Sequence, residues 1–157
     1  MKKEEKTNVM RVLDGKKIPY ESHAYEPDTT LSGEDIANIL GEDPEKVFKT
    51  LVTQGKSGGY YVFVVPVKEE LDLKKAAKVA GEKAVAMIKQ KELLPLTGYV
   101  HGGCSPVGMK KQFKTFIHVT APTHEKIFVS AGKVGIQIEL LPDDLITVAG
   151  CSVADIV

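Results

Sequence analysis

A chain of 157 residues, 43% of them hydrophobic, is long enough to bury one compact core, and we expect a single domain over 1–157. Its 21 basic and 21 acidic residues give a formal net charge of +0. That balance argues against a general DNA or RNA binder, although a local basic surface could still grip one end of an RNA. Two cysteines are too few for a disulfide framework, so a reduced, cytoplasmic setting is the simpler interpretation.

No targeting or membrane segment is expected from the sequence. The charged N-terminal segment, residues 1–6, is not followed by the apolar stretch of a signal peptide. The longest apolar run, near 60–67, is far too short to span a bilayer.

Apolar periodicity and capping residues predict helices and strands that intermix along the chain. In chain order we expect a helix over 7–14, a strand over 19–25, a helix over 33–40, a helical turn from 43, strands over 47–54 and 60–66, a helix over 73–80, a short strand over 84–87, a short helix over 89–94, strands over 115–119, 126–130 and 135–140, and a helix from 142 that ends by 150. Ser32 and Asp72 are typical N-caps, and Gly41 and Gly81 are typical helix ends. Because a hairpin at 55–59 joins two of the strands, the pattern predicts an α+β fold with a mixed sheet.

We expect no metal site and no cofactor. The four histidines, at 23, 101, 118 and 124, are scattered, and no Cys/His spacing is typical of a zinc site.

Lys49 interrupts an apolar strand, 47–52, and is the strongest candidate for a functional cation. Alternation places it on the face of Val47 and Leu51, opposite Thr50. A lysine there costs free energy unless its ammonium group reaches water or an anion. Two interpretations stay open at this point: a side chain that extends from an edge strand to solvent, or a recessed cation that holds a phosphate or carboxylate.

The glycine-rich segment 102–108 is the second candidate. Its sequence, Gly-Gly-Cys-Ser-Pro-Val-Gly, is incompatible with a helix, and its backbone N–H groups could form an oxyanion hole or merely a tight turn. Cys104 has His101 nearby in sequence but no evident third group to orient a base, so it is more typical of a small buried residue than of a nucleophile.

A third candidate is the segment 130–133, which follows a predicted strand and lacks the Walker pattern of a P-loop. Ser130 is either a turn former or a hydroxyl that hydrogen-bonds a substrate amine or carbonyl. Tyr25, at the end of the first strand, could line a pocket or simply pack with its hydroxyl in water. Basic residues also cluster at 74–75, 110–111 and 114, where a solvated face is the commoner role.

Taken in order, these segments resemble the bacterial YbaK/EbsC family, Cys-tRNA(Pro) deacylases related to the editing domain of prolyl-tRNA synthetase. The segments that carry the resemblance are Phe48-Lys49-Thr50-Leu51, 71–77, 97–108, Val129-Ser130-Ala131-Gly132-Lys133 and Pro142-Asp143-Asp144-Leu145. The resemblance implies a single α+β domain around a mixed, barrel-like sheet. It also implies removal of cysteine from mischarged tRNA(Pro) in trans, with the acceptor end of an aminoacylated tRNA as partner and prolyl-tRNA synthetase as a further one.

The same resemblance implies roles for individual residues. Lys49, Gly102 and Ser130 match the family's catalytic positions, and Tyr25 matches its pocket tyrosine. Substrate contacts are also expected from three neighbours of these residues: Thr50, Gly103 and Gly132. The chain departs from the family pattern at Ala131, where glycine is usual, and at Gln137, where an acidic residue is often seen.

The implied chemistry needs no strong protein nucleophile, because an aminoacyl ester is already activated. The thiolate of a cysteinyl ester can attack its own carbonyl, so that proximity supplies much of the acceleration. Lys49 would then anchor a phosphate or ribose rather than act as a general base. Two alternatives stay open: a deacylase that clears another amino acid, such as alanine, with water, and a module that binds tRNA or a synthetase without cleavage.

Overall fold

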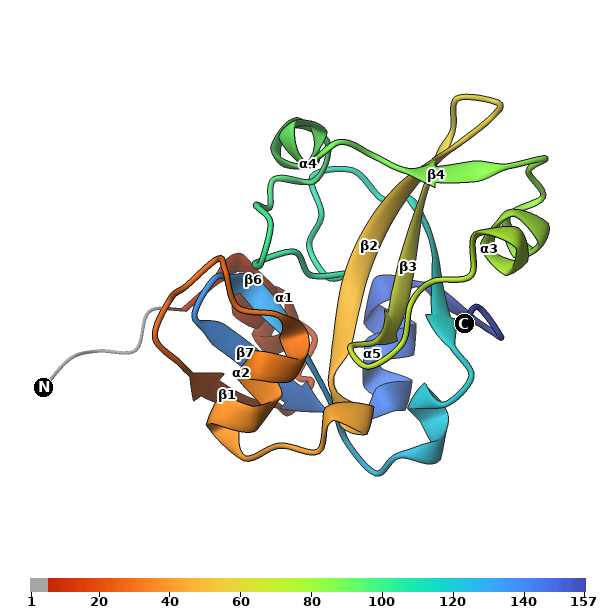
Figure 1. Ribbon diagram of the computed structural model, residues 1–157. Coiled ribbons are helices and arrows are strands. Elements are labelled where there is room, and N and C mark those ends of the chain that lie inside the picture. The colour runs from red at the N-terminus through yellow and green to blue at the C-terminus, as the bar shows by residue number, and fades with distance from the viewer. Residues whose placement is uncertain (1–5) are drawn as a thin grey trace, which may run out of the picture.

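The computed structural model describes residues 6–157 (Figure 1), so the expectation about the N-terminal segment falls almost entirely outside the described residues. The helices are α1 (Asn8–Gly15), α2 (Gly33–Leu40), α3 (Leu73–Ala80), α4 (Gln90–Thr97) and α5 (Pro142–Ala149), with 3₁₀ turns η1 (Pro44–Lys46) and η2 (Ala121–Thr123). The strands are β1 (Glu21–Ala24), β2 (Phe48–Gly55), β3 (Tyr60–Pro66), β4 (Val85–Met87), β5 (Lys114–His118), β6 (Ile127–Lys133), β7 (Ile136–Leu140) and β8 (Cys151–Ala154).

The strands form two sheets that meet at one point. One is antiparallel with the order β1-β7-β6, and the other is mixed with the order β4-β2-β3-β5-β8. A single parallel bridge between Val47 and Phe128 joins the start of β2 to β6. The α+β class with a mixed sheet is confirmed. Within residues 6–157 the sheets do not close into a barrel, because β2 leaves β6 after this bridge and pairs along that edge with β4 instead.

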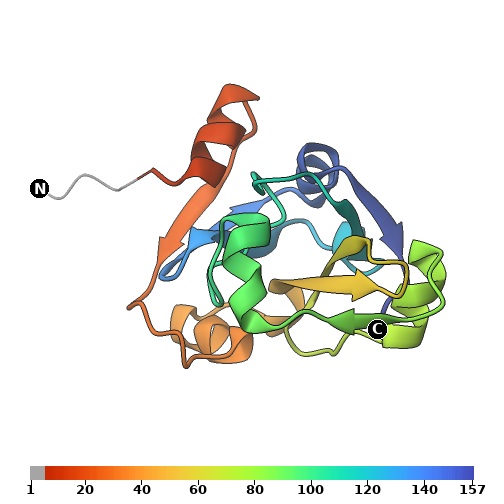
Figure 2. The same cartoon turned by 90° about the horizontal axis from the view of Figure 1, so that it is seen from above.

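Alternation along the strands separates two apolar regions. The main core lies between the sheets and helices α1 and α5, and its fully buried members include Leu13, Ile127, Ile138 and Leu145. On the opposite face of the five-stranded sheet, α3 packs its alanines over Phe63, which stacks on Phe116 with 5.4 Å between the ring centroids. Helix α2 covers a third, small cluster. Figure 2, seen from above, shows α4 lying over the junction between the two sheets.

Local hydrogen bonds explain why the predicted helix ends are correct. Ser32 and Asp35 form a capping box: the Asp35 N–H donates to Ser32 Oγ at 3.1 Å, and the Ser32 N–H donates to Asp35 Oδ2 at 2.9 Å. Asp72 accepts from the N–H groups of Lys74 and Lys75 at the start of α3. These contacts fix where α2 and α3 begin relative to β2.

The main differences from the sequence-based prediction concern α4, β6 and β8. Helix α4 runs through Pro95 to Thr97, because the Thr97 hydroxyl donates to the Leu93 carbonyl at 2.7 Å and the packed leucines hold the last turn. Strand β6 continues past Ser130 to Lys133. Strand β8 was not predicted, since it exists through parallel pairing with β5, which no local pattern reveals.

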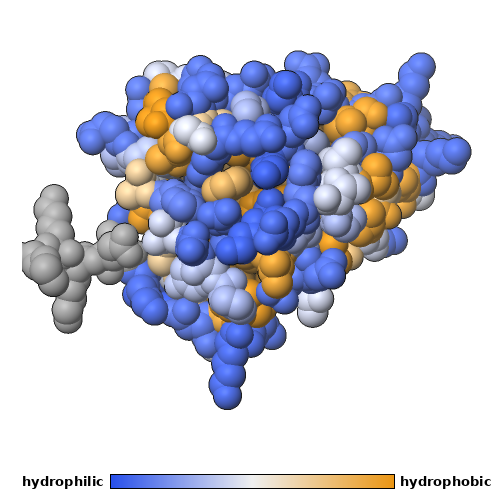
Figure 3. Space-filling model, turned by 90° about the horizontal axis from the view of Figure 1, so that it is seen from below, coloured by the Kyte–Doolittle hydropathy of each residue, from blue (hydrophilic) through white to orange (hydrophobic). Residues whose placement is uncertain are grey.

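The surface is mostly polar. The face seen from below in Figure 3 is largely hydrophilic, with apolar areas separated from one another. Among the described residues, the helices are all too short or too polar to cross a membrane.

Candidate active site

Lys49 lies at a seam between two small apolar clusters. Its neighbour Val47 packs with Ala37 of α2, and Leu51, on the same face, packs against the cluster under α3. Across the ladder Lys49 pairs with the fully buried Val65. Lys49 itself is half-buried. Its methylene groups are therefore packed against the sheet, while its charged ammonium group can still reach a ligand or water.

Ser130 lies on the strand next to Lys49. The bridge pairs Val47 with Phe128, so two residues further along these parallel segments Lys49 and Ser130 reach the same level, on the same face. Ser130 is not at the strand end, as the sequence predicted, but at a bulge inside β6. Its hydroxyl accepts the Gly132 N–H at 3.2 Å. The Ser130 O–H therefore keeps its proton available for another acceptor.

The glycine-rich loop packs against the end of this bulged strand. A Cβ on Gly103 would lie 2.9 Å from the backbone nitrogen of Val134, so only glycine allows this approach. Gly102 has a φ of 86°, in the left-handed region that glycine tolerates. The loop is closed at its base by the Lys110 N–H, which donates to the Thr97 carbonyl at 2.9 Å. Two distant segments of the sequence thus form one wall.

Tyr99 supports this wall from inside, and the sequence analysis missed it. The phenol is buried and donates a short hydrogen bond to the Val107 carbonyl. Burial raises the pKa of Tyr99 to about 12, so it stays protonated and keeps donating. A Cβ added to Gly132 would also lie only 3.0 Å from Cε1 of the Tyr99 ring, so the ring and this glycine pack closely. The signal available in the sequence was the position of Tyr99 between Gly98 and the glycine-rich segment 102–108.

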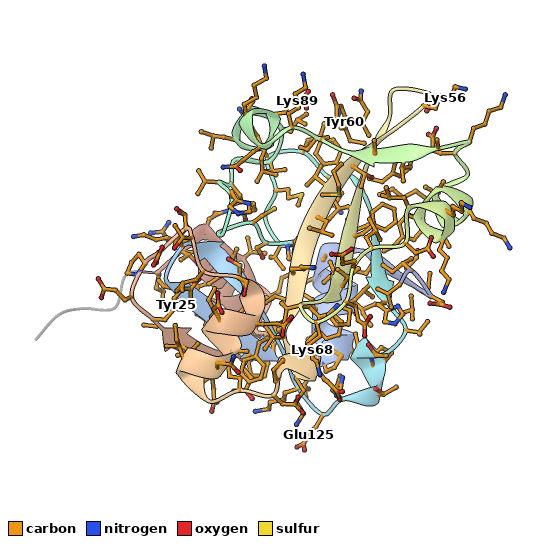
Figure 4. The ribbon with its side chains drawn as sticks, in the orientation of Figure 1. Tyr25, Lys56, Tyr60, Lys68, Lys89 and Glu125 are labelled. Atoms are coloured by element: carbon orange, nitrogen blue, oxygen red, sulfur yellow. The ribbon has the colours of Figure 1, made fainter. Side chains whose placement is uncertain are left out.

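Tyr25 joins the same region from the other side. Its N–H donates to the Gly135 carbonyl at 2.8 Å, which holds it at the β6–β7 turn. The Tyr25 side chain is half-buried and lies on the side of the molecule that carries α2 (Figure 4). The fold therefore gathers Tyr25, Gly103, Ser130 and Gly132 around the β6–β7 hairpin, with Lys49 on the adjoining strand.

Thr50 carries an unpartnered hydroxyl on the opposite face of β2. Its Oγ1 is buried and has no hydrogen-bond partner among the described residues. The Val52 carbonyl accepts from the Ile88 N–H, which follows β4. Backbone groups two residues apart on a strand point to the same edge, so the Thr50 carbonyl faces the edge of β2 where β4 pairs. Thr50 is thus separated from Lys49 by the thickness of the sheet, although both line the split between β6 and β4.

A row of polar residues crosses the three-stranded sheet toward Lys49. His23 pairs with Gln137 across β1 and β7, and Gln137 pairs with Ser130 across β7 and β6. Gln137 is 5% exposed and, in the orientation that satisfies both groups, its amide donates to both carboxylate oxygens of Glu42 at 2.8 Å. The row therefore links the end of α2 to the neighbourhood of Ser130. The sequence analysis noted Gln137 only as a departure and missed Glu42.

The pKa of Glu42 is raised to about 7. Burial of the carboxyl group is the main cause, and the negative charge of Glu139 adds to it, while His23 and the Gln137 hydrogen bond act in the opposite direction. His23 Nε2 lies 2.9 Å from Glu139 Oε1. Together with Leu40 and Phe128, these groups line a surface hollow beside the polar row.

At the β1 end of the polar row, three side chains offer the nitrogen and carboxylate oxygen atoms that commonly bind metal ions. Glu21, His23 and Glu139 place one such atom each within 4.8 Å of one another. Exposed acidic groups of this kind are common without an ion, and the expectation of no metal stays a prediction.

The two thiols are poorly suited to nucleophilic chemistry. Burial raises the pKa of Cys104 to about 12 and that of Cys151 to about 12. Cys104 packs between the main core and the cluster around Val52 and Phe113. Both thiols are therefore protonated near neutral pH, and both cysteines pack in the core as small apolar side chains do.

Comparisons with solved structures define the class of fold. The chain superposes on a protein described as a trans-editing enzyme for prolyl-tRNA synthetase with a TM-score of 0.81, at 24% identity, over 96% of this chain and 97% of the other. A hypothetical protein of unstated activity gives a TM-score of 0.86 at 23% identity, with coverage of 94% and 97%. At these identities the likeness concerns the fold alone. It is the α+β fold of YbaK-like editing domains.

Sequence comparisons define the family. The profile of the aminoacyl-tRNA editing domain matches residues 26–148, and the chain belongs to this family. It is 45% identical over 156 residues to an Enterococcus faecalis protein, EbsC, named for Cys-tRNA(Pro)/Cys-tRNA(Cys) deacylase activity, covering 99% of this chain and 95% of that protein. It is 27% identical over 99 residues to the proline–tRNA ligase of Fervidobacterium nodosum, covering 63% of this chain and 17% of the ligase. The resemblance to the YbaK/EbsC family is confirmed, and with it the class of aminoacyl-tRNA deacylases.

Proposed function

We propose that this protein removes cysteine from mischarged Cys-tRNA(Pro) in trans, in the cytoplasm, and so protects the fidelity of translation. The observation that carries the proposal is the gathering of Lys49, Ser130 and the glycine-rich loop at the split between β2 and β6. This occurs in a chain 45% identical, over nearly its full length, to a protein named for that activity. We further propose that residues 1–157 act as one domain and that prolyl-tRNA synthetase is a partner.

In this proposal each site residue has a distinct task. Lys49 binds a phosphate or the ribose of the terminal adenosine as a fixed positive charge. The loop N–H groups at Gly102 and Gly103 stabilise the oxyanion that forms on the ester carbonyl. The Ser130 hydroxyl donates to the substrate, because it accepts the Gly132 N–H with one lone pair and keeps its own proton for another acceptor. Tyr25 and Gly132 line the pocket, and the buried Thr50 Oγ1 gains a partner when substrate binds.

We propose that the substrate supplies its own nucleophile. The thiolate of the cysteinyl group attacks the ester carbonyl carbon, and the C–O bond to the ribose breaks. The ribose oxygen leaves and takes a proton, so the products are a cyclic thiolactone and free tRNA(Pro). The protein then contributes orientation and oxyanion stabilisation rather than a covalent step. The raised pKa values of both protein thiols support this division of labour.

The two departures from the family pattern bear on amino-acid selectivity. The Ala131 methyl group lies in the main core, on the opposite face from Ser130, so it does not narrow the proposed pocket. Gln137 lies on the pocket face and is paired with the carboxylate of Glu42. We propose that Glu42, in the turn after α2, supplies the carboxyl group that other members carry at the position of Gln137.

A panel of mischarged tRNAs tests the function directly. Purified protein is offered Cys-tRNA(Pro), Ala-tRNA(Pro), Ser-tRNA(Pro) and Cys-tRNA(Cys), and the loss of each amino acid is followed over time. The proposal expects Cys-tRNA(Pro) to be cleared fastest. Preferential clearance of alanine would support the alternative deacylase that uses water, and binding of tRNA without release of any amino acid would support the non-catalytic module.

A further inference from the structure

Charge is strongly segregated in this chain although its net charge is zero. Residues 83–114 contain six lysines and one acidic residue, Glu92. Residues 26–45 contain seven acidic residues and no lysine or arginine. The first segment holds α4 and the glycine-rich loop, and the second holds α2. In Figure 1, α4 lies at the top and α2 at the lower left of the molecule, with β6 between them.

The lysines of the first segment surround one apolar cluster. Ile88, Leu93, Met109 and Phe113 pack together with Tyr60. The lysines that flank these residues in sequence, all of them exposed, are Lys89, Lys91, Lys110, Lys111 and Lys114. We call these five residues the α4 ledge. Within residues 6–157 none of the five forms a salt bridge, whereas Lys6 and Lys75 do.

The half-buried Tyr60 ring and exposed apolar side chains lie among these charges. Tyr60 meets Phe113 edge to face at 5.8 Å between centroids, and the Lys111 ammonium group lies 6.0 Å from the centre of the Phe113 ring. Leu94 is 53% exposed and Val100 is 48% exposed. Clustered lysines on one face are typical of surfaces that bind the phosphate backbone of RNA.

The α4 ledge is continuous with the glycine-rich loop. The loop leaves α4 at Gly98 and returns at Lys110, whose N–H bonds the carbonyl of Thr97. Figure 2 shows α4 directly over the junction of the two sheets. A polyanion whose end lies in the loop would meet the ledge on one side and the acidic α2 segment on the other. Of these two surfaces, the lysines of the ledge attract a polyanion and the carboxylates of the α2 segment repel it.

We propose that the α4 ledge is the docking surface for the acceptor stem of tRNA, with the acidic α2 segment repelling the stem from the opposite side. This inference rests on the proposed function, since it takes the acceptor end to lie in the glycine-rich loop. Unpaired lysines contact the phosphate backbone and release its counterions, so the interaction is independent of tRNA sequence and falls with salt. The balanced net charge keeps binding confined to this surface.

The test compares two charge-reversing double variants of the full chain. Lys89→Glu/Lys111→Glu changes the ledge, and Lys68→Glu/Lys126→Glu makes the same change of charge elsewhere. Figure 4 shows Lys89 near the top of the molecule, Lys68 in its lower half, and Glu125, the neighbour of Lys126 in sequence, at the bottom. Glu at position 89, the N-cap of α4, is compatible with the helix dipole. Circular dichroism and thermal unfolding confirm that each variant is folded.

The first readout is the affinity for uncharged tRNA(Pro), measured by filter binding from about 50 to 200 mM salt. The ledge variant should lose about tenfold or more in affinity, and its slope of log K against log salt should fall by about 2, or about 1 for each lysine removed. The control variant should behave as the wild type. Equal affinities of both variants for tRNA would overturn the proposal, and loss of synthetase binding alone would assign the ledge to a protein partner.

The second readout separates docking from chemistry. On full-length Cys-tRNA(Pro), kcat/KM of the ledge variant should fall through a higher KM. On the cysteinyl ester of a CCA trinucleotide, which does not reach the ledge, kcat/KM should equal that of the wild type. A proportional loss on both substrates would contradict a docking role. If the wild type deacylates neither substrate, the proposed function fails, and the binding measurement alone still decides the role of the ledge.

Discussion

At the scale of single residues, Lys49 carries the strongest functional expectation. The change Lys49→Ala should lower the deacylation rate on Cys-tRNA(Pro) by about 100-fold or more, because a fixed charge near the reacting ester is lost. Lys49→Met should do the same while it keeps the packing of the methylene groups. Rates are measured under single-turnover conditions, with Lys78→Met on α3 as a matched control. Near-normal rates for folded Lys49→Ala would remove Lys49 from the site.

The thiols give a second residue-scale prediction. The double change Cys104→Ser/Cys151→Ser should keep most of the deacylase activity, because both thiols are protonated near neutral pH. Stability should fall modestly, since each change places a hydroxyl in an apolar site. Activity is compared at a temperature well below the unfolding midpoint. Complete loss of activity in a folded Cys104→Ser single variant would indicate thiol catalysis by the enzyme itself.

At the scale of elements, the contact between the glycine-rich loop and β6 is the most sensitive to side-chain volume. Gly103→Ala should destabilise the protein by about 1–3 kcal/mol and lower deacylation, because its Cβ would lie 2.9 Å from the backbone nitrogen of Val134. Gly15→Ala, with nothing within 4 Å of its Cβ, is the matched control. Urea unfolding and initial rates are measured for both. Wild-type behaviour of Gly103→Ala would show that the loop and the hairpin can separate without cost.

The contact between Glu42, in the turn after α2, and Gln137 of β7 should depend on pH. The pKa of Glu42 is raised from 4.5 to about 7, so between these values the folded protein holds a proton that the unfolded chain has released. The free energy of unfolding therefore falls as the pH rises through this window, and the penalty is complete above about pH 7. Glu42→Gln should remove this fall and be more stable than the wild type at pH 8.

Urea unfolding at pH 4.5, 6 and 8 checks this expectation. The stability difference between Glu42→Gln and the wild type should widen toward pH 8. Glu45→Gln, a change at an exposed position of η1, serves as the control. A constant difference across the three pH values would show that Glu42 ionises as freely in the folded protein as in the unfolded one.

Local signals predicted elements well where one short segment decides the structure. The Ser32 and Asp72 caps and the glycine ends gave correct bounds for α2 and α3, because these hydrogen bonds lie within a few residues. The bulge at Ser130 and the strand β8 were missed, because both depend on partners far along the chain. The helix predicted over 89–94 continues through Pro95 to Thr97, because packing of the last turn outweighs the missing N–H of the proline.

At the scale of the whole molecule, the candidate site is a product of long-range assembly. The sequence identified Lys49, Gly102 and Ser130 separately, through residue types that are unusual in their local setting and through the family resemblance. It could not show that β2 meets β6 at Val47, or that the glycine-rich loop packs on Val134. Tyr99 and the pair of Glu42 and Gln137 were missed because their roles appear only once three elements come together.

The central claim is that the assembled site positions an aminoacyl ester whose own thiol completes the reaction. The most direct measurement compares Cys-tRNA(Pro) with Ser-tRNA(Pro) from about pH 6 to 9, a range that spans the ordinary thiol pKa of about 8.5, with mass spectrometry of the released amino acid. The account predicts much faster release of cysteine, a rate that rises as the substrate thiol ionises, and a trappable thiolactone. Equal rates on the two esters, with no thiolactone, would contradict it and indicate attack by water.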